Sequence, residues 1–146
     1  MQDPMLRLLR VLLATLGVAA IAICLSIFFL GPDFTSWRAE LLFDALTGGD
    51  HTLSPSWPPT MDSELRFYAP FWGSYGILLI AAARRLPQRA DWVPWLALLF
   101  FTGGVGRAIS YAAVGAPHPF FLLLMAIELG LPPVLALLWW RTRRPG

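Results

Sequence analysis

Four long segments in which apolar residues predominate constrain this chain more than any other feature. They cover about residues 8–31, 63–83, 91–114 and 119–140. Because a helix rises about 1.5 Å per residue, each segment is long enough to cross a hydrocarbon core of about 30 Å. A lipid-exposed backbone must satisfy its own hydrogen bonds, so the spans are expected to be helices. We therefore predict an all-α integral membrane protein, a four-helix bundle.

The composition agrees with a membrane protein of one domain. Charged residues make up 14% of the chain and hydrophobic residues 57%, whereas a soluble domain has about 25% charged residues. Four spans leave no separate soluble core, so residues 1–146 are predicted to form one membrane domain. Arg7 and Arg10 precede the first span as they would in a signal peptide, but the span is too long and lacks a small-residue cleavage site. We expect this helix to be retained.

The arginines predict the orientation in the membrane. All eleven basic residues are Arg, and eight of them lie in the N-terminal segment, in the link at 84–91 and in the C-terminal segment. The loop at 32–62 carries one arginine and five acidic residues. The positive-inside rule then places both termini in the cytoplasm, and we predict a multi-pass membrane protein. The arginines form no basic surface interleaved with aromatic residues, so no nucleic-acid partner is expected.

The outer loop at 32–62 is predicted to contain a short amphipathic helix. In "SWRAELLFDAL" one helical stripe is apolar and the opposite stripe is charged. The apolar stripe comprises Trp37, Leu41, Leu42 and Ala45, and the charged one Arg38, Glu40 and Asp44. Gly48 and Gly49 would end the helix. We expect it to lie on the outer membrane surface or to cap the bundle.

Two ionisable residues, Arg107 and Glu128, fall deep inside the last two spans. Ionisable side chains are costly to place in a membrane, so each of the two is expected to have a functional role and a group with which it pairs. Measured from a turn near Ala116, they lie about 13 and 18 Å down an antiparallel helix pair, an offset of about 5 Å. We predict that they pair, directly or through water. The alternative is a purely structural pair that fixes the register of the helices.

The second span carries a polar and aromatic stripe. Glu64, Tyr68, Trp72 and Tyr75 are spaced four, four and three residues apart, so they share one helix face, and Arg66 points about 200° away. With residues of the last two spans the stripe predicts an outward-facing polar pocket. Its eight candidate residues are Glu64, Tyr68, Trp72, Tyr75, Arg107, Tyr111, His118 and Glu128. The alternative is that the aromatic residues only pack or form a membrane belt, Glu64 is a charge at a helix start, and His118 is an ordinary turn residue.

No metal site or cofactor is predicted. His51 and His118 have no partners at the spacing of a metal site. The glycine-rich "GGVGR" lies inside a span and lacks the strand–turn–helix context of a phosphate loop.

Two segments resemble a known family. "ELRFYAPFWGSYGILL" at 64–79 and "GGVGRAISYAAVGAPHPFFLLLMAIELGLPPVL" at 103–135 are similar to signature blocks of the "domain of unknown function 4345" family of small bacterial membrane proteins. The resemblance extends over roughly residues 5–141 and implies four spans, but no biochemical activity. Together with the apolar spans it implies a location in the bacterial inner membrane. The matching positions are Glu64, Arg66, Tyr68, Gly73, Gly104, Arg107, Ser110, Gly115, His118, Pro119 and Glu128. The loop "GGDHTLSPSWPPTMD" departs from the family pattern.

These features predict that the protein binds a small amphipathic molecule, such as a lipid, a quinone or a sterol-like compound, or a partner membrane protein. A first alternative is an enzyme in which Glu128 or Glu64 is the general acid or base and Arg107 stabilises an anion. A second is a proton-coupled carrier in which Glu128 alternates between Arg107 and substrate. Four spans are few for a carrier, so it would need to form a homo-oligomer. Membrane lipid is an expected partner in every case.

Overall fold

The computed structural model describes residues 4–143, and within this range the chain is helical and contains no strand. The predicted all-α class is therefore confirmed. The helices are α1 (Pro4–Leu30), α2 (Pro32–Thr47), α3 (Pro59–Arg84), α4 (Leu86–Arg89), α5 (Trp92–Val114) and α6 (Pro119–Arg143).

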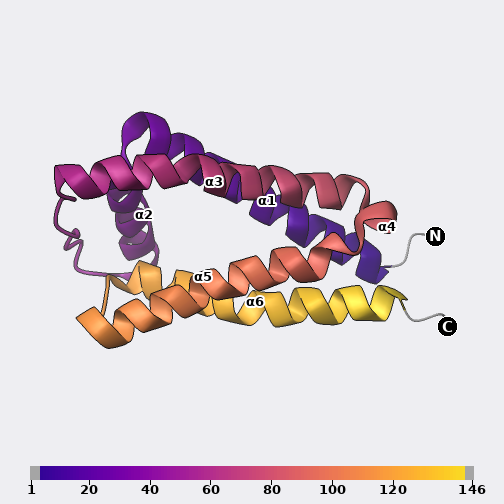
Figure 1. Ribbon diagram of the computed structural model, residues 1–146. Coiled ribbons are helices and arrows are strands. Elements are labelled where there is room, and N and C mark those ends of the chain that lie inside the picture. The colour runs from indigo at the N-terminus through magenta and orange to yellow at the C-terminus, as the bar shows by residue number, and fades with distance from the viewer. Residues whose placement is uncertain (1–3, 144–146) are drawn as a thin grey trace.

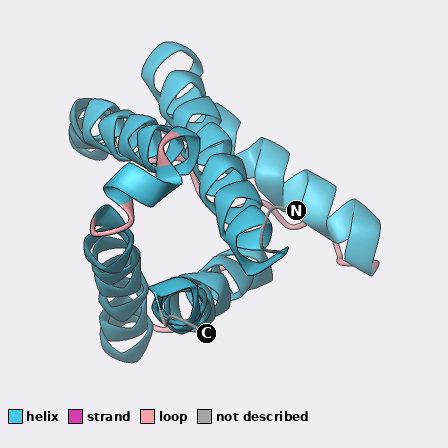
Figure 2. Ribbon diagram, turned by 90° about the vertical axis from the view of Figure 1, so that its right-hand side faces the viewer, coloured by secondary structure: helices cyan, strands magenta, loops and turns pink. Residues whose placement is uncertain are grey.

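The four long helices α1, α3, α5 and α6 run lengthwise along the molecule, and α2 crosses one end (Figure 1). The start of α1, the end of α6 and the short α4 lie at the opposite end, which Figure 2 turns toward the viewer. We call these the α2 end and the terminal end. The most extensive packing joins α1 to α3 and α5 to α6, and α2 contacts α1, α3 and α6. The chain thus forms two helix pairs with α2 attached across one end.

Three helices, α1, α5 and α6, are long and apolar enough to cross a membrane. The sequence predicted four spans, and the remaining long helix is α3. With 26 residues α3 is long enough, but Asp62, Glu64 and Arg66 in its first turns, followed by Tyr68 and Pro70, lower its hydropathy. Its length therefore permits a crossing that its composition alone does not indicate.

The backbones of α1 and α3 touch at two glycines. A methyl group added at Gly17 would lie 2.7 Å from the Gly76 carbonyl oxygen, and one added at Gly76 would lie 2.7 Å from the Gly17 carbonyl oxygen. Glycine is the residue that permits such close helix contact. Toward the terminal end the space between the helices is filled by an apolar core, which includes Leu9, Leu13, Leu79, Leu86, Val93 and Leu135.

The predicted helix in the outer loop is present as α2, and it ends at the predicted glycine. Gly48 adopts a left-handed conformation with φ 76°, and its N–H donates to the Asp44 carbonyl, an arrangement that glycine accommodates at a helix end. The helix does not cap the others with its apolar stripe. Leu41 and Leu42 of that stripe are 38% and 63% exposed, whereas Glu40 and Asp44 are buried. The two carboxylates of the charged stripe face inward because both find hydrogen-bond partners there, which burial of a charge requires, whereas Arg38 is exposed.

Glu40 anchors the proline-rich connector to α2. Its carboxylate accepts hydrogen bonds from the Ser54 N–H at 2.9 Å and from the Ser54 hydroxyl at 2.7 Å. The Ser54 carbonyl in turn accepts a hydrogen bond from the Trp37 indole N–H at 2.8 Å. One residue of the connector is thus held at three atoms, which fixes the path from α2 to α3.

Ser54→Ala is expected to loosen this connector, because it removes one of the two hydrogen bonds to a fully buried carboxylate. The expected loss of stability is about 1–3 kcal/mol. Hydrogen exchange of residues 49–58 measures the effect, with Ser63→Ala as the control because Ser63 is exposed. Equal exchange in the two variants would contradict an anchoring role for Glu40.

Candidate functional site

The predicted pairing of Arg107 with Glu128 is present between α5 and α6. Arg107 Nε lies 2.8 Å from Glu128 Oε2, and the two side chains are 38% and 8% exposed. Gly104 makes room for α6 beside the pair, because a methyl group there would lie 3.0 Å from the Glu128 Cβ and 2.9 Å from Leu129. A buried carboxylate is thus held against a half-buried guanidinium.

The Arg107 guanidinium has donors to spare. Of its five N–H donors, the Nε–H alone contacts Glu128, and within residues 4–143 its terminal nitrogens form no hydrogen bond. The guanidinium carbon lies 5.8 Å from the centre of the Phe121 ring, so an aromatic wall stands beside the charge. The pair therefore offers N–H donors to an oxygen acceptor while Glu128 keeps the arginine in place.

The aromatic part of the α3 stripe packs against α5 elsewhere. The rings of Trp72, Tyr75 and Phe100 are stacked, with centroids 5.3 to 6.4 Å apart. The buried Tyr75 hydroxyl donates to the Leu96 carbonyl at 2.7 Å. Phe100 precedes Arg107 by seven residues, about two helical turns. Trp72 and Tyr75 therefore belong to the helix packing rather than to the surroundings of the charge pair.

The other predicted pocket residues are spread over the surface. Tyr68 and Tyr111 are 58% and 46% exposed, and Glu64 is exposed too. Tyr68 packs edge-on against Phe67. Across the described part of the chain, no hydrogen bond, ion pair or ring contact joins the α3 stripe to Arg107 or Glu128. The structure does not bring the eight residues together in one pocket, because α3 packs chiefly on α1 and meets α5 only sparsely.

His118 joins the start of α6 to α2. Its Nε2 lies 3.4 Å from both carboxylate oxygens of Asp44, and its Nδ1 accepts the Phe120 N–H at 3.2 Å. Since Nδ1 accepts, the ring proton of neutral His118 belongs on Nε2, facing Asp44. The imidazole also packs against Phe43. His118 therefore anchors α2, a role that sequence reasoning did not assign to it.

The comparison with protein families identifies the chain. The family model described as "Domain of unknown function (DUF4345)" matches residues 8–140. The chain belongs to this family. Searches of the curated proteins and of the solved structures found no match. The family domain contains the Arg107–Glu128 pair, the α3 stripe and His118, so all eight predicted residues lie within it.

Two further contacts of this family member lie outside the predicted set. Arg66 faces away from the stripe, as predicted, and its guanidinium donates to Asp62 at 2.8 Å and to the Phe28 carbonyl at 2.8 Å. In the exposed loop the Thr52 N–H donates to Asp50, which holds the pKa of that carboxyl below its usual value.

Over residues 4–143 there is no group of three or more His, Cys, Asp or Glu residues that could hold a metal ion. The Arg107–Glu128 pair, in which a buried carboxylate holds a guanidinium that keeps N–H donors to spare, is the best candidate for a functional site.

Proposed function

We propose that the protein is a four-span protein of the bacterial inner membrane with both termini in the cytoplasm. Three helices apolar enough to cross support this arrangement, as does the length of α3. The start of α1, the end of α6 and the α3–α5 link, which together carry seven of the described arginines, lie at the same end of the molecule (Figure 1). The exposed Leu42 and Leu46 suit a helix α2 that rests on the outer membrane surface.

We propose further that the protein binds a small amphipathic molecule, such as a lipid, a quinone or a sterol-like compound, whose head group carries an oxygen acceptor. One observation carries this proposal: Arg107 uses only its Nε–H on Glu128, which leaves four N–H donors for a ligand. Because these donors lie within an apolar helix pair, binding of a head group that accepts hydrogen bonds is favoured there. The apolar surfaces of α5 and α6 would contact the body of the ligand.

Arg107→Ala is expected to remove such a ligand from protein purified in mild detergent. The measurement is native mass spectrometry, in which the wild type should carry a bound ligand. Arg107→Ala should lower the fraction of protein that carries this ligand about tenfold or more. Glu128→Gln should retain more of it, since the guanidinium stays in place.

Arg38→Ala is the matched control, because it removes an exposed arginine at the same end of the molecule. Equal occupancy in wild type and Arg107→Ala would contradict the proposal. A bound protein that Arg107→Ala releases would identify a membrane-protein partner instead. A ligand that is chemically converted, with conversion lost in Glu128→Gln, would favour an enzyme.

A further inference from the structure

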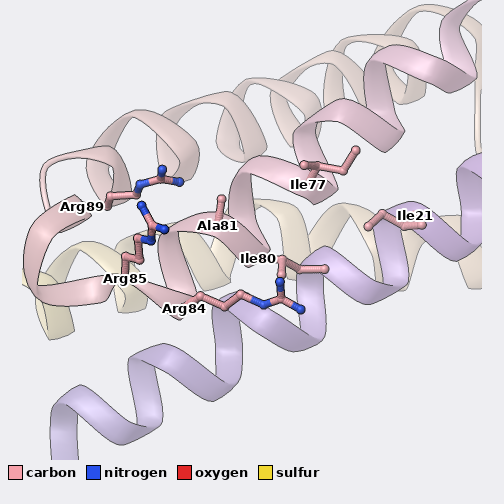
Figure 3. Close-up of a pocket in the computed structure, with 7 residues that line it drawn as sticks. All are labelled: Ile21, Ile77, Ile80, Ala81, Arg84, Arg85 and Arg89. Atoms are coloured by element: carbon pink, nitrogen blue, oxygen red, sulfur yellow. The ribbon is translucent and has the colours of Figure 1, made fainter.

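A pocket lies toward the terminal end of the molecule, on α1, α3 and α4. This pocket of about 330 Å³ is lined by arginines on one side and aliphatic side chains on the other (Figure 3). The arginines are Arg84, Arg85 and Arg89, and the aliphatic residues include Ile21, Ile77 and Ile80. This pocket shares no residue with the Arg107–Glu128 pair.

The three arginines carry uncompensated positive charge. In the described part of the chain none of them forms an ion pair; Asp91, the acidic residue that follows them, pairs with Arg143. The Arg89 guanidinium lies over the Trp92 ring at 4.4 Å from its centre, which orients the group but does not neutralise it. Three like charges around one pocket repel one another unless an anion lies between them.

The Arg84 side chain lies along the apolar side of the pocket. Side chains on a helix point back toward its N-terminus, and Figure 3 shows the Arg84 side chain running along Ile80 in the direction of Ile21. Its aliphatic stem thus covers apolar surface and its charged head remains beside the isoleucines. A guanidinium at the edge of an apolar region is stabilised by an anion that can enter the same region.

We infer that this pocket binds an anionic phospholipid. The phosphate lies among the guanidinium groups of Arg84, Arg85 and Arg89, where charge-assisted hydrogen bonds are strongest. One acyl chain lies along Ile21, Ile77 and Ile80. A basic pocket between membrane helices on the cytoplasmic side is typical of sites for anionic lipid head groups. The pocket volume suits a head group and the first part of a chain.

The test is lipid titration of the delipidated protein, followed by native mass spectrometry. Dioleoyl-phosphatidylglycerol is expected to bind about tenfold or more tightly than dioleoyl-phosphatidylcholine, and the double variant Arg84→Gln, Arg85→Gln should abolish that preference. The matched control is Arg7→Gln with Arg141→Gln, which removes the same charge from exposed positions outside the pocket. An equal loss in the control would show diffuse attraction and overturn the site.

Two further measurements test the pocket. If the double variant does not fold, Arg85→Gln alone, at an exposed position, should still weaken phosphatidylglycerol binding severalfold, and unchanged binding would refute the site. Millimolar inorganic phosphate should fail to displace the lipid, because it gains nothing from the isoleucines. Full displacement by phosphate would identify an ion site and overturn the lipid proposal.

Discussion

Gly76→Ala is expected to destabilise the protein by roughly 1–3 kcal/mol, because the added methyl group has no room between α1 and α3. It would lie 2.7 Å from the Gly17 carbonyl oxygen and 2.9 Å from the Ile21 side chain. The nearer atom belongs to the backbone, so a side-chain rotation cannot relieve the clash and α1 must move. Gly17→Ala should act in the same way, since its methyl group would meet the Gly76 carbonyl oxygen at 2.7 Å.

The chain offers a matched control for both substitutions. Nothing lies within 4 Å of a methyl group added at Gly106 or Gly130, which are also within helices. Alanine is the better helix former by about 1 kcal/mol, so Gly106→Ala and Gly130→Ala should leave the stability equal or raised. Thermal unfolding in detergent measures all four variants. Equal unfolding temperatures for Gly76→Ala and Gly106→Ala would contradict the close α1–α3 contact.

The sequence predicted the helices better than their pairing. Apolar runs and the residues that flank them set the ends of the long helices, and Gly115 and Pro119 mark the turn between α5 and α6. The contact of Gly17 with Gly76 was not predicted, because several glycines lie in the spans and periodicity does not say which of them face another helix. Which two helices pack most closely depends on complementary shapes across the chain.

In the candidate site, too, one contact could be predicted from the sequence and the others could not. Arg107 and Glu128 could be paired from sequence because both depths are measured from one short turn, so little uncertainty accumulates. The α3 stripe could not be placed, since its spacing gives a common face on α3 but not the direction of that face in the molecule. On α2 the two carboxylates of the charged stripe are buried, because Ser54 and His118, far along the chain, supply partners for Glu40 and Asp44.

Arg107→Met is expected to cost more stability than the double substitution Arg107→Met, Glu128→Leu. The single change leaves the Glu128 carboxylate, 8% exposed, without its partner. Breaking a fully buried pair costs about 3–5 kcal/mol, and because Arg107 is 38% exposed we expect a smaller cost here, about 2 kcal/mol. The double variant replaces both charges by apolar side chains and should return to within about 1 kcal/mol of the wild type. Thermal unfolding in detergent, with Arg38→Met as the control, measures this difference.

The double variant also separates the two roles of the pair. If the pair only fixes helix register, the restored variant keeps any bound molecule, because the apolar replacements hold α5 and α6 together equally well. If Arg107 binds the ligand, the restored variant is as stable as the wild type yet empty in native mass spectrometry, since no guanidinium remains to donate. Stability recovered with the ligand retained would refute the proposed site. Stability recovered with the ligand lost would assign binding to Arg107 independently of folding.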